Sequence, residues 1–182
     1  FESLGWAASL QPVEVATPVL ADARDFLTRR LEQVLTEEGH PVDRVRAVLP
    51  QAGRPAIADK LLAQLGRLVA EKDFLALAEA VQRARRIVPA GTPAAYDATA
   101  LTEPAELALH EAVTAVRDKL DSAPDLGRFT VVAAPIVEPV HRFFEDVFVM
   151  AEEPALRAAR LGLLATIRDL AGDWLDWPQL KL

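Results

Sequence analysis

Hydrophobic positions recur at helical spacing along most of the chain, and prolines and glycines separate the segments. After Pro18, leucines and valines repeat every three or four residues up to Gly39, which predicts a long helix closed by a glycine cap. Pro50 ends a short helix, Pro55 opens another, and the helix after that ends before the loop at Pro89. The first half of the chain is therefore expected to be helical from about residue 19.

The second half shows the same period. Pro104 begins a helix with an apolar stripe, a turn is predicted at 122–127, and a last helix at 154–171. Pro135 and Pro139 lie between the turn and the last helix, and each costs about 3 kcal/mol inside a straight helix, so a kink or two helices are expected. Because no segment alternates with period two, the fold class is all-α, a helical bundle of about seven to eight helices.

The organisation of the chain follows from these patterns. Residues 1–18 lack a sustained period and are expected to be a linker or the remnant of an upstream domain, and residues 19–182 form one helical domain. The start lacks a methionine and a signal-peptide pattern, so the chain is expected to be a piece of a longer protein. No apolar run reaches the roughly 18 residues of a membrane span, and a soluble, cytoplasmic protein is expected.

Composition excludes several kinds of chemistry. There is no cysteine, and the three histidines, His40, His110 and His141, are too scattered to form a metal centre. The chain has no glycine-rich phosphate loop and no nucleophile elbow. We therefore expect no catalytic residue, no metal and no cofactor in this chain.

The net charge of −7 opposes general nucleic-acid binding, so any RNA contact must come from local basic patches. Two arginine clusters stand out. On the last helix three arginines fall within an arc of about 80° beside an apolar stripe, and three others close the helix before Pro89. Guanidinium groups hold phosphate oxygens and stack on unpaired bases, so both clusters are candidate RNA contacts. The six candidates are Arg83, Arg85, Arg86, Arg157, Arg160 and Arg168. The simpler alternative is that they are solvated or paired within the chain.

Aromatic residues near these clusters have two possible roles. Phe143, Phe144 and Phe148 could stack on bases, but the i, i+4 spacing of Phe144 and Phe148 is more typical of a core. Trp174 and Trp177 are expected to clamp the last helix onto the bundle. The aromatic residues are thus interpreted mainly as structural.

Two ungapped segments carry a resemblance to a known family. Residues 143–150 followed by 154–164 are similar to the terminal signature of the bacterial glycyl-tRNA synthetase beta subunit. In that family a Phe-Phe-Asp-x-Val-x-Val-Met segment leads into a Leu-Arg-x-Asn-Arg-Leu helix. Here Glu145 replaces the Asp and Ala159 replaces the Asn, which removes an amide able to read a base edge.

The resemblance extends upstream and covers about residues 19–182. Residues 25–31 and 37–49 look like a helix, turn and short helix of the family, 82–87 occupies the place of a Lys-Arg-Val-x-Asn-Ile motif, and 102–106 that of a Glu-Pro-x-Glu helix start. The resemblance implies a helical anticodon-binding domain like that of arginyl-tRNA synthetases, with glycine tRNA as partner and no role for DNA or a membrane. It implies a parent enzyme that joins glycine to its tRNA, with ATP and Mg held by the alpha subunit or a fused alpha region.

Two alternatives remain from the sequence. The acidic charge and paired tryptophans also fit a helical protein–protein interaction module without RNA binding. A fragment of an arginyl-type synthetase fits less well, because that family usually ends in a Met-rich and Arg-rich helix.

Overall fold

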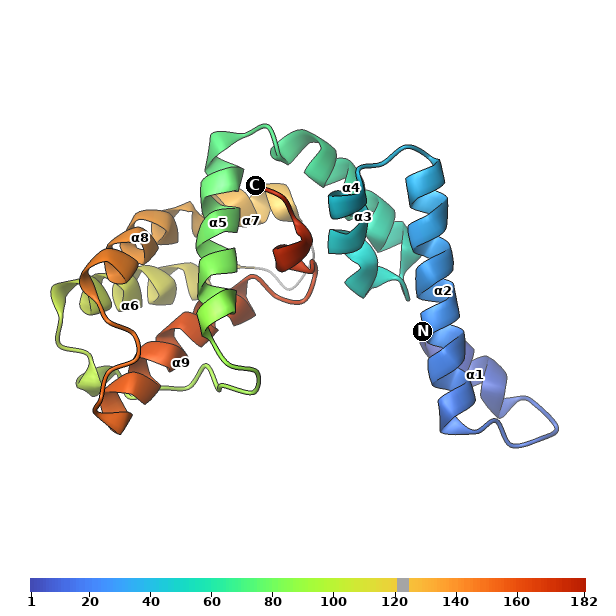
Figure 1. Cartoon of the computed structure of the whole chain (residues 1–182), viewed down its shortest axis with the longest axis horizontal. Coiled ribbons are helices and arrows are strands. Elements are labelled where there is room, and N and C mark those ends of the chain that lie inside the picture. Colours follow the sequence, from blue (N-terminus) through green and yellow to red (C-terminus); the bar gives the residue numbers. More distant parts are fainter. Residues whose placement is uncertain (121–124) are drawn as a thin grey trace. The chain divides into compact units, whose positions relative to one another are not determined.

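A computed structural model describes residues 1–120 and 125–182, and within these residues the chain consists of helices and loops without a strand (Figure 1). The predicted all-α fold is confirmed. Of the turn expected at 122–127, residues 122–124 lie outside the described residues. The described part resumes at Asp125, whose carboxylate caps a helix by accepting a hydrogen bond from the Arg128 N–H at 3.0 Å.

The chain forms two compact units. Unit 1 contains residues 1–66 and 174–181, and unit 2 contains residues 67–173 together with residue 182. The sequence predicted one domain over residues 19–182 and gave no sign of this division, because the helix that crosses it, Pro55–Leu68, has an uninterrupted period. Each unit has its own set of packed helices and is described separately.

Unit 1 is built on the long helix α2 and the short helices beside it. Gly39 closes α2 with a φ of +90°, a conformation that glycine adopts without strain. Residues 1–18, predicted to be a linker or the remnant of an upstream domain, contain the helix α1, which packs against α2. The elements are α1 (Glu2–Ser9), α2 (Thr17–Glu37), α3 (Val42–Val48), η1 (Leu49–Gln51), α4 (Pro55–Leu68) and η4 (Trp177–Gln179).

The C-terminal tail completes unit 1. The 3₁₀ turn η4 packs against α3, and the N–H of Asp176 donates to the carbonyl of Ala47 at 2.7 Å. Trp177 is fully buried, as are Leu175 and Leu180. Trp177 therefore holds the tail against α3 within unit 1, and the predicted clamping of the last helix by Trp174 and Trp177 stays a prediction.

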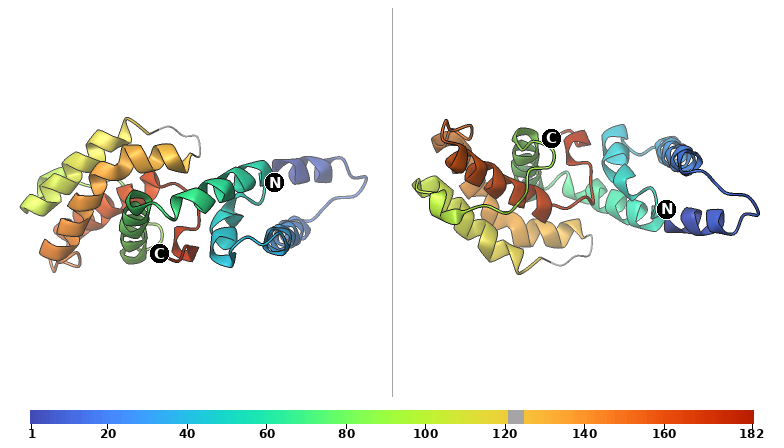
Figure 2. Two further views of the ribbon diagram at one scale, coloured as in Figure 1. Left: turned by 90° about the horizontal axis from the view of Figure 1, so that it is seen from above. Right: turned by 90° about the horizontal axis from the view of Figure 1, so that it is seen from below.

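Unit 2 is a bundle in which α5 packs against α9 and α6 packs against α8 (Figures 1 and 2). Its core is apolar and includes Phe74, Phe129, Phe143 and Leu163, each essentially without exposed surface. The elements are α5 (Lys72–Ile87), η2 (Ala98–Ala100), α6 (Pro104–Arg117), α7 (Leu126–Ala133), η3 (Ala134–Ile136), α8 (Val137–Asp146) and α9 (Pro154–Leu170).

The two prolines of the segment 128–151 act as the sequence predicts. Pro135 lies in η3, where the chain changes from α7 to α8, so the segment forms two helices. Pro139 lies in the first turn of α8, where a missing backbone donor costs no intrahelical hydrogen bond. The break redirects the chain so that α8 can pack on α6.

Candidate nucleic-acid interface

All six arginines predicted to contact RNA lie in unit 2, on α5 and α9. They do not form one exposed surface. Arg83 and Arg86 are exposed, Arg85, Arg157 and Arg168 are half-buried, and Arg160 is buried. The geometry therefore divides the predicted contacts into internal and solvent-facing groups.

Arg160 is the clearest departure from the predicted arginine ridge. It is 7% exposed, and its Nε forms an ion pair with the carboxylate of Glu106, which is fully buried. Its Nη1 donates to the backbone carbonyl of Phe148 at 2.7 Å. Contact with a phosphate would leave the Glu106 charge buried without its partner, which is costly. The structure thus gives Arg160 an internal role and contradicts its place on an exposed ridge.

Glu106 connects this ion pair to the start of α6. Its second carboxylate oxygen accepts hydrogen bonds from the backbone N–H groups of Thr102 at 2.7 Å and Glu103 at 2.9 Å, as in a capping box. Burial alone raises the pKa of this carboxyl, but the hydrogen bonds from Glu103, Arg160 and Thr102 outweigh burial and hold the pKa below its usual value. Glu106 is therefore the anion that Arg160 needs in the core.

Arg157 and Arg160 together fix the segment between α8 and α9. Arg157 donates from Nη1 to the carbonyl of Ala151 at 3.2 Å, three residues beyond the carbonyl held by Arg160. The two arginines of the terminal signature thus serve as backbone clamps. Their spacing of three residues places them on neighbouring positions of α9, from which both reach the same segment.

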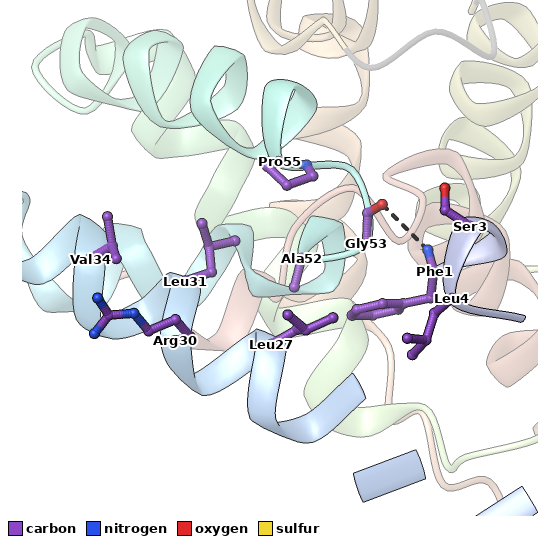
Figure 3. Close-up of a pocket in the computed structure, with 10 residues that line it drawn as sticks. All are labelled: Phe1, Ser3, Leu4, Leu27, Arg30, Leu31, Val34, Ala52, Gly53 and Pro55. Carbon is purple, nitrogen blue, oxygen red and sulfur yellow. Dashed lines mark hydrogen bonds between the residues drawn. The ribbon is translucent and has the colours of Figure 1, made fainter. Parts of the chain in front are cut away.

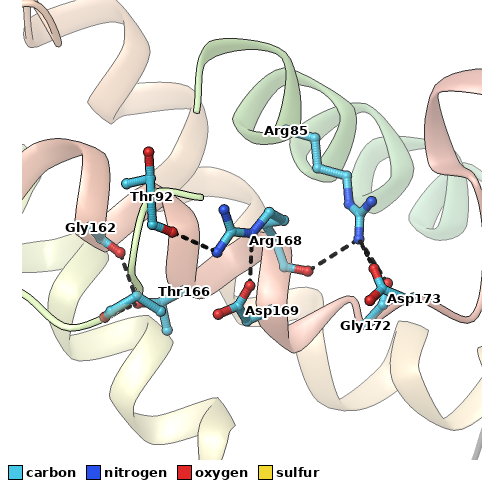
Figure 4. Close-up of polar contacts among 9 residues, drawn as sticks. Arg85, Thr92, Gly162, Thr166, Arg168, Asp169, Gly172 and Asp173 are labelled. Atoms are coloured by element: carbon cyan, nitrogen blue, oxygen red, sulfur yellow. Dashed lines mark hydrogen bonds and ion pairs between the residues drawn. The ribbon is translucent and has the colours of Figure 1, made fainter. Parts of the chain in front are cut away.

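Arg85 and Arg168 also donate to loop backbone (Figure 4). One terminal nitrogen of Arg85 donates to the carbonyl of Gly172 at 2.8 Å and lies 3.3 Å from a carboxylate oxygen of Asp173, so this arginine caps the C-terminal end of α9. Arg168 donates to the carbonyl of Thr92 at 2.9 Å and pairs with Asp169 at 2.7 Å. Both side chains hold loops against the bundle.

The loop before α6 is packed tightly onto α9 at Gly162. A Cβ added there would lie 2.7 Å from the Cβ of Tyr96 and 3.2 Å from the carbonyl oxygen of Ala95. Thr166 on the next turn donates to the Ala94 carbonyl at 3.3 Å. Only glycine leaves room for this approach, so position 162 is a packing requirement of the loop.

Arg83 and Arg86 form the solvent-facing pair. They are three residues apart near the end of α5 and so lie on one face of that helix. The guanidinium carbon of Arg83 lies 4.3 Å from the centre of the Phe144 ring, a cation–π contact that leaves its N–H donors available. Among the residues that the structure describes, Arg86 has no ion-pair partner. Arg83 and Arg86 are thus the exposed members of the predicted set.

The aromatic residues differ from the sequence-based interpretation at one position. Phe143 is buried and Phe144 half-buried, but Phe148, expected in the core, is 75% exposed. The helix α8 ends at Asp146, so the i, i+4 relation between Phe144 and Phe148 does not apply. The helical pattern gave no indication that Phe148 is exposed. Val147 and Val149 on either side of it have a spacing of two, which is typical of an extended segment.

The histidines and acids form no metal site in the part of the chain that the structure describes. His110 accepts or donates a 2.7 Å hydrogen bond with the hydroxyl of Tyr96, and His40 lies on the surface 4.0 Å from Glu38. Burial raises the pKa of Tyr96, an effect that the charge of Arg117 partly offsets. Within the described residues no helix is long and apolar enough to cross a membrane.

Unit 1 contains a pocket of about 360 Å³ with a mainly apolar lining (Figure 3). Gly53 lies at one end, where its carbonyl accepts a hydrogen bond from the amino group of Phe1 at 3.3 Å. Leu27 and Leu31 of α2 form one wall, and Leu4 of α1 contributes from the other side. Arg30 is the charged side chain of the lining.

Comparison with known proteins identifies the relatives of this chain. It is 34% identical over 174 residues to a chloroplastic/mitochondrial glycine–tRNA ligase of Arabidopsis thaliana, which covers 93% of this chain and 16% of the relative. Glycine–tRNA ligase beta subunits of Dechloromonas aromatica and Haemophilus influenzae are 36% and 37% identical over 96% and 84% of this chain, and 26% and 23% of their own lengths. No protein-family model matches.

These similarities define the class first: the chain is related to aminoacyl-tRNA synthetases. More narrowly, it belongs with the glycine–tRNA ligase beta subunits and corresponds to part of them, as the terminal signature indicated. The chain spans about a quarter or less of the length of these relatives.

Proposed function

We propose that this chain is a tRNA-binding part of a glycine–tRNA ligase and binds the anticodon arm of glycine tRNA. The observation that supports the proposal most strongly is the 33–37% identity to glycine–tRNA ligases over most of the chain. The all-helical fold fits a binding role. In this proposal the chain itself performs no chemistry.

The parent enzyme would condense glycine with ATP and transfer it to tRNA. ATP and Mg would be held in an alpha subunit or a fused alpha region, which would be the protein partner of the parent. The bacterial relatives are named beta subunits, which supports a partner of this kind. The chain described here would contribute to choosing the tRNA.

Arg83 and Arg86 are the proposed phosphate contacts. Both are exposed, both project from one face of α5, and an arginine fork can hold two phosphate oxygens. Arg85, Arg157, Arg160 and Arg168 contribute indirectly, because each donates to a backbone carbonyl and holds a loop in place. Because the net charge of the chain is −7, a localised contact with RNA is more consistent with its composition than binding through a broad basic surface.

A titration of the full chain tests the proposal. Glycine tRNA should bind more tightly than the same tRNA carrying a foreign anticodon, at a stated salt concentration. The slope of log affinity against log salt should become shallower by about 1.4 when Arg83 and Arg86 are both changed to Ala, because each lost phosphate contact contributes about 0.7. Weak and equal binding of both tRNAs would overturn anticodon recognition.

The matched control replaces Arg24 and Arg29, which are exposed on α2 of unit 1. This double change removes the same charge from the chain as the α5 double change. An unaltered slope in the control, with a shallower slope in the α5 variant, assigns the contact to α5. Equal changes in both variants would show only a response to total charge.

A protein-docking role is the second candidate, and the exposed apolar surface of unit 1 favours it. Trp6, Val13 and Phe26 are 68%, 69% and 67% exposed, which is unusual for large apolar side chains of one small unit. Stable self-association in size-exclusion chromatography, without tRNA binding at low salt, would support this role in place of RNA binding.

A further inference from the structure

Phe148 is an aromatic side chain held out from the bundle. It is 75% exposed and Met150 is 48% exposed, whereas Val147, Val149 and Ala151 between and beside them are each less than 10% exposed. The buried side chains anchor the segment, and the alternation turns Phe148 and Met150 outwards. The exposure of Phe148 is therefore fixed by the packing of its neighbours.

The backbone of the same segment is held at two carbonyls. Arg160 donates to the carbonyl of Phe148 at 2.7 Å, and Arg157 donates to that of Ala151 at 3.2 Å. Arg160 is itself fixed by its ion pair with the buried Glu106. A ligand that meets Phe148 does not have to order this backbone first, which favours affinity.

The charges around Phe148 indicate what part of an RNA would meet it. Glu145, Asp146, Glu152 and Glu153 flank the segment in sequence and are all exposed, and their carboxylates repel phosphate. Carboxylates do accept hydrogen bonds from the exocyclic amino groups of bases, as from cytosine N4. An exposed aromatic ring in a segment flanked by acidic residues therefore suits an unpaired base and does not suit the RNA backbone.

A phosphate contact lies within reach of such a base. Arg83 stacks on Phe144, and Phe144 and Phe148 are four residues apart, so their Cα atoms are separated by at most about 14 Å. Phosphates held by Arg83 and Arg86 would leave neighbouring bases close to Phe148. Unpaired bases of RNA loops are commonly stacked on aromatic side chains.

We infer that Phe148 is a stacking platform for an unpaired base of the bound tRNA, one that carries an exocyclic amino group. The inference rests on the proposed function and adds to it a base contact that does not depend on charge. Stacking by itself accepts any base, because every base has a π face. The acidic residues that flank the segment favour cytosine or adenine over uracil, because they can accept a hydrogen bond from an exocyclic amino group.

The test compares glycine tRNA binding by the full wild-type chain and by Phe148→Ala. The variant should bind about 10- to 100-fold more weakly, because the loss of one stacked base is of this size. The slope of log affinity against log salt should not change, since stacking releases no counterions. Phe148→Tyr should restore most of the affinity. The urea midpoint should stay unchanged, because the side chain is exposed.

Val131→Ala is the matched control, because Val131 is 76% exposed on α7 and its loss should leave the affinity unchanged. If the wild-type chain binds and Phe148→Ala binds equally well, the stacking platform is overturned while the proposed function stands. Phe148, Met150 and the acidic residues that flank the segment would then fit a basic protein surface better. A shallower salt slope for Phe148→Ala would overturn stacking. Absence of wild-type binding at low salt would overturn the proposed function and the platform with it.

Discussion

The arginines of α9 and those of the exposed face of α5 look alike in the sequence and differ in the structure. On α9, Arg157, Arg160 and Arg168 all donate to backbone carbonyls of loops. On α5, Arg83 and Arg86 face solvent. The same residue type at similar helical spacing thus holds the fold together in one region and remains available for a ligand in the other.

The difference shows that the position of an arginine on a helical wheel does not decide its role. What decides it is whether a loop with free carbonyls passes over that face of the helix. The segment 147–153 and the loop before α6 both cross α9, and each has carbonyls that need donors. Among residues 1–120 and 125–182, none accepts a hydrogen bond from the Arg83 or Arg86 side chain, which leaves these donors for another molecule.

The largest expected effect is that of Arg160→Ala. Its loss would leave the charge of Glu106 buried and unpaired, and breaking a buried ion pair in this way costs about 3–5 kcal/mol. Urea denaturation measures the free energy of unfolding. Arg160→Lys keeps the charge and should lose less, which covers the case in which the alanine variant does not fold. A loss below about 1 kcal/mol for Arg160→Ala would remove the distinction between the two regions.

A second prediction concerns the loop that Arg168 holds on α9. Gly162→Ala should push against Tyr96, at a cost of about 1–3 kcal/mol that a helix-propensity gain of about 1 kcal/mol partly offsets. The matched control is Gly66→Ala on α4, where nothing lies within 4 Å of the added Cβ and a gain of up to about 1 kcal/mol is expected. Thermal denaturation of both variants tests this contrast. Equal gains would show that the loop does not pack closely on α9.

A third prediction uses pH. The pKa of Glu106 is lowered in the folded chain, so the folded state favours the charged carboxylate. The stability from this group is present above its ordinary pKa of 4.5 and is lost as pH falls through the lower folded value. The free energy of unfolding of Glu106→Gln should therefore be lower at neutral pH and should change less than that of the wild type between neutral pH and about pH 3. Parallel pH profiles of the two chains would contradict this role.

The smallest expected effect on stability is that of the α5 pair. Changing Arg83 and Arg86 together to Ala should lower the free energy of unfolding by about 1 kcal/mol or less, because Arg83 loses an exposed cation–π contact with Phe144 and Arg86 is a surface residue. The same variant is the one expected to flatten the salt dependence of tRNA binding. A decrease of several kcal/mol in the free energy of unfolding would show that this pair stabilises the fold, as the arginines of α9 do.

The helices could be predicted from the sequence because their ends are local. Gly39, Pro55 and Pro135 act through their own backbone geometry, and the structure ends or begins elements beside each of them. The roles of Arg160 and Phe148 could not be predicted in the same way. Arg160 is buried by a segment that a helical wheel does not include, and Phe148 lies two residues beyond the end of α8, where the helical period no longer holds.

The return of the tail to unit 1 has a consequence for synthesis on the ribosome. Unit 1 needs residues 174–181, which bury Trp177 and join Asp176 to Ala47, and these residues follow residues 67–173 of unit 2 in the chain. Domains generally fold as their sequence emerges. Unit 1 is therefore synthesised first, but the core of unit 2 can form earlier. The N-terminal helices of unit 1 complete their core only after the tail with Trp177 has been synthesised.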